Sequence, residues 1–131
     1  MPGYTYENFL PDEPIVIYTA LEEWNTPENL AASDDHGRDI IFNVDQPIFW
    51  ILDISQITLD ITSMMMFANK YTRGEDATWT HPNVRQLCII TTDELVHQMA
   101  AGMRQSDAFG YLDVKIFPNR DEALVFARET S

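Results

Sequence analysis

The sequence predicts a single α/β domain, with a mainly parallel sheet of about four strands alternating with about four helices. Short apolar runs rich in β-branched residues alternate along the chain with segments whose apolar residues recur at helical spacing. Proline, glycine and helix-capping residues separate the two kinds of segment. A length of 131 residues is enough for one hydrophobic core and leaves little room for a second. We therefore treat residues 1–131 as one domain.

The most strongly patterned part of the chain lies between Pro47 and Arg73. Residues 48–52 form an unbroken apolar run that ends at Asp53, which is typical of a strand buried on both faces. Apolar residues then recur at helical spacing from Ile61 until Gly74, where a helix would stop. We expect this strand, turn and helix to form the centre of the fold.

The N-terminal segment, residues 1–13, mixes Pro, Gly, Asn, Tyr and acidic residues without a period. We expect an ordered arm or a loose tail, with aromatic side chains that could dock on a partner subunit. Residues 15–21 are a β-rich apolar run and are predicted to form the first strand.

The segment 26–45 is predicted to be a helix, because Thr26 can cap it and Pro27 suits the first helical position. Gly37 lies inside this helix and weakens it by about 1 kcal/mol relative to Ala. A break at Gly37, with residues 39–44 forming a strand, is therefore an open alternative.

Two more strands and two more helices are predicted after Gly74. Residues 84–91 are expected to form another buried strand, and the pattern Thr91-x-x-Glu94 predicts a capped helix to about Gln105. Residues 112–117 read as the last strand, and Asn119 is expected to cap the final helix.

The formal net charge of −13 excludes some partners. Residues 1–60 hold twelve acidic residues and one basic residue, whereas residues 61–131 hold nine acidic and seven basic residues. Such a field repels nucleic acids and anionic membranes. It favours a basic protein partner, although solubility alone also explains it. The chain has no apolar run of membrane-span length and no signal peptide pattern, and Cys88 reads as a buried, inert thiol, so we expect a cytoplasmic protein.

Recognisable catalytic, metal and cofactor motifs are missing from the sequence. No strand is followed by a glycine-rich phosphate loop, and no Gly-x-Ser-x-Gly elbow is present. The pair Asp93 and His97 is four residues apart and reads as a helix-surface pair, because further metal ligands are absent. We predict no enzyme, no cofactor and no metal site. Beside the two hypotheses given at the end of this section, a third is an enzyme that acts through Asp53 or His97.

Several residues around the central strand are candidates for contacts with a ligand or partner. Asp53 follows the strand, where open α/β sheets place ligand-contacting residues, although local turn capping explains it as well. Met64–Phe67 is a flexible apolar patch suited to a partner helix or an apolar ligand. The full set of candidate contacts is Trp50, Asp53, Asp60, Met66, Phe67 and Trp79.

Two segments resemble STAS domains, the anti-sigma factor antagonist fold. Residues 53–63, DISQITLDITS, resemble the family's D-L-S-x-V-x-F-I-D-S-S-G segment, and residues 116–124, IFPNRDEAL, resemble its V-F-x-T-x-E-E-A-L ending. The strand–helix order also fits the SpoIIAA-like branch of the family, and the resemblance covers about residues 14–129. In that family a partner kinase phosphorylates a Ser that corresponds to Thr62 here, with Ser63 beside it. The family's flanking Asp and Gly are replaced by Ile61 and Met64.

The resemblance implies a bacterial, non-enzymatic regulatory or protein-interaction module. Its implied partner is a regulatory kinase or an anti-sigma factor, and a homodimer is a further alternative. A second hypothesis is a binding module for an apolar or lipid-like small molecule held near Trp50, Met64–Phe67 and Trp79. Joint exposure of Thr62 and Met66 on one surface would indicate an interaction face, whereas burial would indicate ordinary core.

Overall fold

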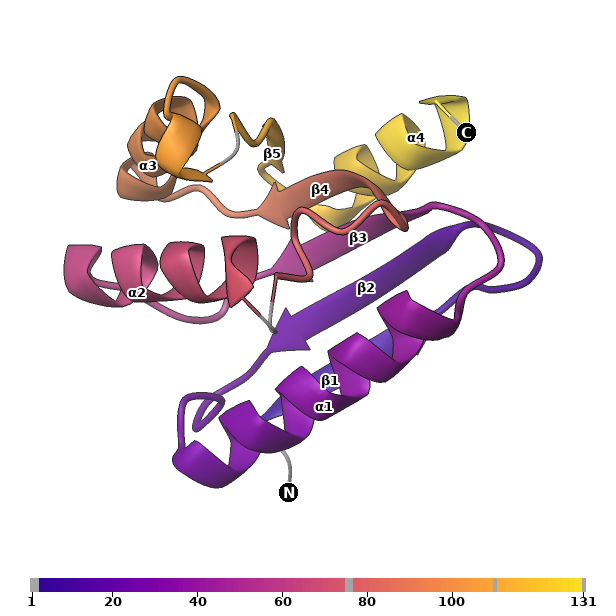
Figure 1. Cartoon of the computed structure of the whole chain (residues 1–131), viewed down its shortest axis with the longest axis horizontal. Coiled ribbons are helices and arrows are strands. Elements are labelled where there is room, and N and C mark those ends of the chain that lie inside the picture. The colour runs from indigo at the N-terminus through magenta and orange to yellow at the C-terminus, as the bar shows by residue number, and fades with distance from the viewer. Residues whose placement is uncertain (1–2, 75–76, 110, 131) are drawn as a thin grey trace.

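The computed structural model describes residues 3–74, 77–109 and 111–130. They form one five-stranded sheet in the order β1-β2-β3-β4-β5 (Figure 1). The first two strands are antiparallel, and every later neighbour is parallel. The strands are β1 (Tyr4–Asn8), β2 (Ile15–Ala20), β3 (Ile48–Asp53), β4 (Val84–Ile90) and β5 (Val114–Phe117). The predicted α/β fold with a mainly parallel sheet is confirmed.

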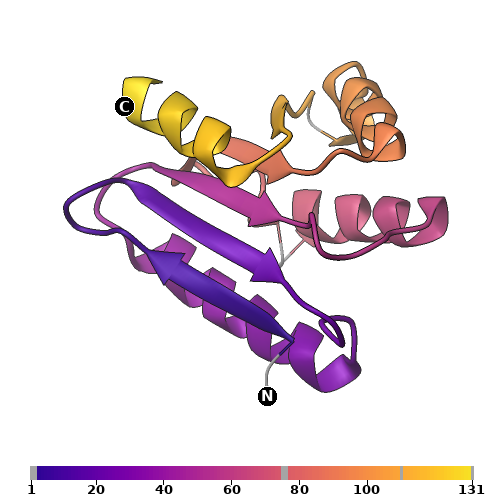
Figure 2. The same ribbon diagram turned by 180° about the vertical axis from the view of Figure 1, so that it is seen from behind.

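Four helices cover the two faces of the sheet unequally. They are α1 (Pro27–Asn43), α2 (Ile61–Thr72), α3 (Glu94–Arg104) and α4 (Arg120–Thr130). The core on one face joins Ile41 of α1, Ala68 of α2 and Met103 of α3 to strand residues. On the opposite face, Ala123 and Ala127 of α4 pack against the sheet, and Figure 2 shows α4 as the only helix there among the described residues.

The central strand β3 separates these two cores. Its side chains alternate between the faces, as in any strand. Ile48 and Trp50 belong to the core under α1, α2 and α3, whereas Phe49 and Ile51 belong to the core under α4. All four are buried, so the prediction of a strand buried on both faces is confirmed.

The N-terminal segment is not a separate arm in its described part. Residues 4–8 form the edge strand β1, with Tyr6 opposite Tyr18 in the register. The segment is also tied to the far side of the sheet, because Arg120 of α4 forms an ion pair with Glu7. Only the spacing of Tyr4 and Tyr6 indicates a strand here, and the position of β1 comes from its pairing with β2.

Helix α1 runs without a break from Pro27 to Asn43, so the alternative of a strand at residues 39–44 is wrong. The expected cap is present, because the Asn29 amide donates to the Thr26 hydroxyl at 3.2 Å. Gly37 is buried where α1 crosses the sheet, and a Cβ there would lie 2.9 Å from the Tyr6 hydroxyl oxygen. Close packing of α1 against the sheet thus accounts for a residue that helix propensity alone disfavours.

The Gly37→Ala substitution is expected to lower the free energy of unfolding by about 1 kcal/mol. The methyl group adds helix propensity worth about 1 kcal/mol, but the crowding against a hydrogen-bonded Tyr6 costs about 2 kcal/mol. Gly102→Ala is the matched control, since a Cβ there meets nothing within 4 Å inside α3, and it is expected to stabilise. Urea unfolding of both variants measures the difference. Stabilisation by both substitutions would contradict the close approach at Gly37.

One helix start differs from the expected one, because the N-cap of α3 is Asp93 rather than Thr91. Thr91 instead accepts from the Asp93 amide at 3.1 Å. Helix α2 begins at Ile61, where the helical spacing begins, and its N-cap is Asp60, whose carboxylate accepts from the Ser63 amide at 2.7 Å. The predicted cap of α4 is confirmed, because the Glu122 amide donates to the Asn119 side chain at 3.0 Å.

Candidate functional site

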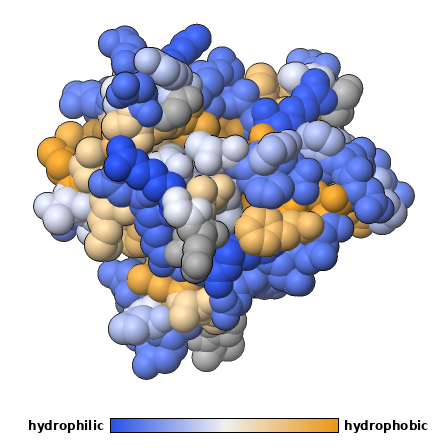
Figure 3. All heavy atoms as spheres, viewed as in Figure 1, coloured by the Kyte–Doolittle hydropathy of each residue, from blue (hydrophilic) through white to orange (hydrophobic). Residues whose placement is uncertain are grey.

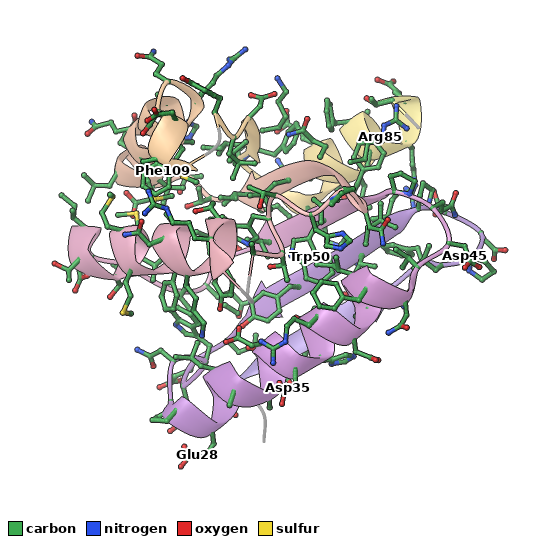
Figure 4. All side chains as sticks on the ribbon, viewed as in Figure 1. Glu28, Asp35, Asp45, Trp50, Arg85 and Phe109 are labelled. Carbon is green, nitrogen blue, oxygen red and sulfur yellow. The ribbon has the colours of Figure 1, made fainter. Side chains whose placement is uncertain are left out.

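A cavity lies between α1 and α2 on the face of the sheet that carries three helices. Its free volume is about 100 Å³, and the space between its walls reaches about 890 Å³ only when the open solvent at its mouth is included. Figure 4 shows Trp50 on the sheet beside α1, and its neighbours in the cavity wall come from α1 and α2, from β1 to β4 and from α3. A concave site with a mostly apolar lining is the usual form of a small-molecule site in a protein.

The floor of the cavity is an aromatic cluster on the sheet. Tyr6 of β1, Tyr18 of β2 and Trp50 of β3 point to the same face. The ring centroid of Tyr6 lies 5.1 Å from that of Tyr18 and 5.7 Å from that of Trp50. Gly37 permits this arrangement, because its missing side chain leaves room for the Tyr6 hydroxyl and the Trp50 ring.

A second aromatic row forms the wall on the side of α2. Phe67 and Tyr71 lie on the inner side of the helix with ring centroids 6.1 Å apart. Trp24, from the loop after β2, lies 5.2 Å from Phe67, and Trp79, from the loop before β4, lies 5.2 Å from Tyr71. The two rows together place seven aromatic rings around one cavity.

One carboxylate stands among these rings. The Asp34 side chain of α1 is only 9% exposed. It accepts a hydrogen bond from the Tyr71 hydroxyl at 2.6 Å and forms an ion pair with Lys70. The Lys70 ammonium also lies 5.5 Å from the centroid of the Tyr71 ring. These contacts connect α1 and α2 across the cavity.

The tyrosines of the cavity are held in their neutral form. Burial raises the pKa of Tyr18 to about 12. Burial also raises the pKa of Tyr6 and of Tyr71 far above the usual range, and the hydrogen bond to Asp34 adds to the effect at Tyr71. The rings therefore present neutral, electron-rich faces to the cavity at every physiological pH.

The outer side of α2 carries an exposed apolar face. Ile61 is 61% exposed, Met65 is 40% exposed and Met66 is 55% exposed. Thr62 is exposed beside them, one helical turn before Met66. Leu95, at the start of the neighbouring α3, adds a further exposed apolar side chain. Figure 3 shows hydrophobic surface at the left edge of the view, where α2 and α3 meet.

The structure divides the candidate contact residues into separate groups. Trp50, Phe67 and Trp79 line the cavity together. Met66 and Thr62 lie outside on the exposed face of α2. Met64 joins the cavity group, because it is 3% exposed and lies in the cavity wall.

Asp53, Asp60 and Ser63 act in local structure. Asp53 is buried at the end of β3 and accepts from the Ser55 amide at 3.0 Å and the Ser55 hydroxyl at 2.6 Å. Asp60 caps α2 through the Ser63 amide, and this hydrogen bond lowers the pKa of the Asp60 carboxyl. The capping explanation of these carboxylates is thus the one that the hydrogen bonds support.

Asp53 and His97 are not brought together. Asp53 follows Phe49 and Ile51 on the face covered by α4, and its charge acts on Arg120 of that helix. His97 is exposed on α3, which lies on the other face. Among the described residues, no three His, Cys, Asp or Glu side chains are grouped so that they could hold a metal ion.

Sequence reasoning missed most of the cavity wall, including its polar and aromatic residues Tyr6, Tyr18, Trp24, Asp34 and Tyr71. Asp34 and Asp35 are adjacent acidic residues, but only Asp35 is exposed and paired with Arg38 on the surface. The spacing of Tyr4 and Tyr6, two residues apart, was the one available signal of a strand face in this region.

Within residues 3–74, 77–109 and 111–130, the structure contains no helix that is both long enough and apolar enough to cross a membrane. Cys88 is buried in β4, and burial raises the pKa of its thiol to about 12, as expected for an inert cysteine.

Comparison with known proteins adds one structural relative. No family model and no curated protein matches the chain. A crystal structure of an uncharacterised protein of the DUF3478 family from Shewanella loihica PV-4, described as having a SpoIIAA-like fold, superimposes with a TM-score of 0.56. The two share 17% sequence identity, over 95% of this chain and 91% of that chain. At this identity the likeness establishes the fold, and the chain therefore has the SpoIIAA-like fold that its two motifs implied.

Proposed function

We propose that the protein is a non-enzymatic regulatory module that contacts a protein partner through the outer face of α2. The observation that carries this proposal is the joint exposure of Ile61, Thr62, Met65 and Met66. Residues four apart lie above one another on a helix, so these four form two adjacent rows on one side. Exposed methionines are adaptable and suit a surface that binds another protein.

Thr62 is the residue through which the partner contact would be switched. It lies at the second position of α2, two residues after the cap formed by Asp60, and next to Met66 on the exposed side. Phosphorylation would add about two negative charges there. The helix dipole favours these charges, while Asp60 and the neighbouring apolar side chains disfavour them. A phosphate would thus turn an apolar contact face into an anionic one.

The proposed partner is a basic protein in the same compartment, the cytoplasm. The formal charge of −13 favours association with positively charged surfaces and raises their rate of encounter. A second copy of this chain is the competing occupant of the face. Light scattering on the purified protein separates the two, because a stable dimer would double the measured mass.

Met66→Glu is expected to abolish capture of the partner from a lysate of the source cells. The substitution places a charge at the centre of the apolar face, and loss of a central contact in such interfaces costs at least about 2 kcal/mol. Val125→Glu is the matched control, because Val125 is 52% exposed but lies on α4, on the other side of the sheet. Affinity is then measured by calorimetry with the captured protein after purification.

The contact and the switch are tested separately. Equal capture by both glutamate variants would contradict a contact through α2. For the switch, mass spectrometry of protein purified from its source should detect phosphate on Thr62. Full partner binding and regulation by Thr62→Ala would contradict the switch and leave the contact face intact.

A second function, binding of an apolar small molecule, is favoured by the cavity between α1 and α2. The aromatic side chains around it bury apolar surface of a ligand as well as of the protein. Native mass spectrometry of protein purified from its source should show a mass above that of the chain alone. A clean apo mass would count against this second function.

A further inference from the structure

The cavity contains a binding position for a positively charged group. Asp34 is the carboxylate in its wall, and its side chain is 9% exposed. The ammonium group of Lys70 forms an ion pair with the Asp34 carboxylate and lies over the Tyr71 ring. Lys70 thus shows the geometry in which this site holds a cation.

We propose that the cavity binds an apolar organic cation, whose ammonium head replaces that of Lys70 on Asp34. This inference rests on the second function proposed above, the binding of an apolar small molecule. The apolar body of the ligand would lie over the floor formed by Tyr6, Tyr18 and Trp50. The protein would then recognise hydrophobic amines and quaternary ammonium compounds.

Replacement of Lys70 requires little rearrangement. Its side chain is 34% exposed at the edge of the cavity, and a lysine stem is long and flexible. An ion pair with a partly exposed partner contributes little to stability, because water screens it. Lys70 can turn into solvent when a ligand arrives, whereas Asp34 is held in place by the Tyr71 hydroxyl.

The aromatic walls favour the same class of ligand. A cation near the face of Trp or Tyr is attracted by the ring quadrupole, and the attraction increases when water is excluded. Seven aromatic rings surround the cavity, and burial keeps its tyrosines neutral. Aromatic rings around a cation are the arrangement that recognises quaternary ammonium groups, and Asp34 adds a carboxylate to it here.

Anionic ligands are disfavoured at this position. A fatty-acid carboxylate would lie against Asp34, and Lys70 would have to leave Asp34 in order to pair with it. Arg38, the basic residue in the cavity wall, already donates to Asp35. The net charge of −13 also repels anions over a longer range.

The test compares three ligands with the same decyl chain: decyltrimethylammonium, decanol and decanoate, each below its critical micelle concentration. Intrinsic fluorescence is a direct readout, because all three tryptophans of the chain, Trp24, Trp50 and Trp79, line the cavity. We expect the ammonium compound to bind at least about tenfold more tightly than decanol, and decanoate to bind most weakly.

Two variants and one control test the role of Asp34. Asp34→Asn is expected to weaken decyltrimethylammonium binding by about tenfold or more and to leave decanol binding within about twofold. Lys70→Ala is expected to strengthen binding of the ammonium compound several-fold, because the competing cation is gone. Asp39→Asn is the matched control, since it removes the same charge from an exposed side chain of α1 that is outside the cavity wall, and it should change little.

The outcomes separate the cation proposal from the function on which it rests. If none of the three ligands binds to a folded protein, small-molecule binding at the cavity is wrong. If all three bind equally well, the cavity is an apolar site and the cation proposal is overturned. Weaker ammonium binding by Lys70→Ala would also overturn it, because Lys70 would then support the site and not compete for it.

Discussion

Phe49→Ala is expected to lower the free energy of unfolding by about 3–5 kcal/mol, which is a large part of the stability of a domain this size. The Phe49 side chain is 0% exposed and lies in the core under α4. Its ring meets that of Phe126 edge-on at 6.0 Å, and the Arg85 guanidinium lies 5.1 Å above it. Truncation would leave a cavity that the surrounding strands cannot collapse to fill.

Phe42→Ala provides the matched control for Phe49→Ala. Phe42 is 50% exposed near the end of α1 and contacts the His81 ring at 5.0 Å. Its loss is expected to cost about 0.5 kcal/mol. Chemical denaturation of both variants gives the comparison. A loss below about 1 kcal/mol for Phe49→Ala would contradict the packing of this face.

Trp50→Ala is expected to have two effects, a loss of stability of about 3 kcal/mol and a loss of decyltrimethylammonium binding of more than tenfold. Trp50 is 4% exposed, so truncation removes buried apolar surface. It also forms the centre of the cavity floor under Gly37. Removal of its ring eliminates an aromatic face that a bound cation would meet.

The neighbouring residue separates these two effects. Phe49 adjoins Trp50 in β3 but points to the opposite face of the sheet. Phe49→Ala should therefore reduce stability without changing ligand affinity, when binding is measured at a temperature at which both variants are folded. Equal loss of binding in the two variants would show that the effect is general destabilisation and not loss of the cavity floor.

The part of the fold that could be predicted from the sequence is the part with a local pattern. The run at residues 48–52 and the caps at Thr26 and Asn119 each depend on neighbouring residues, and each prediction is confirmed. Strand β1 has no such pattern, because its position depends on pairing with β2 and on the contact of Glu7 with Arg120. The continuity of α1 through Gly37 likewise depends on a distant partner, the Tyr6 side chain.

The candidate site was predictable only in part, for the same reason. Large apolar residues near the central strand, such as Trp50, Phe67 and Trp79, indicated where a ligand could bind, and the structure places them in one cavity. Asp34 could not be distinguished from Asp35 by composition. The helical rotation of about 100° between them sends one carboxylate into the cavity and leaves the other in solvent.

Helix α2 connects the two proposed functions. Its inner side, with Met64, Phe67 and Tyr71, lines the cavity, and its outer side carries Thr62 and Met66. A ligand that displaces Lys70 from Asp34 would remove the ion pair that connects α2 with α1. Ligand binding would then change the affinity for the partner by the same factor by which partner binding changes the affinity for the ligand.

Methyl NMR of protein labelled at the methionine methyl groups tests the central claim most directly, namely that the two sides of α2 have separate binding roles. Met64 and Met99 line the cavity, whereas Met65 and Met66 are on the exposed face of the helix. Single Met→Leu variants assign the signals. We predict that decyltrimethylammonium shifts Met64 and Met99 first, and that the captured partner shifts Met65 and Met66 first. Shifts at Met65 and Met66 alone with the ligand, or at Met64 and Met99 alone with the partner, would contradict the account.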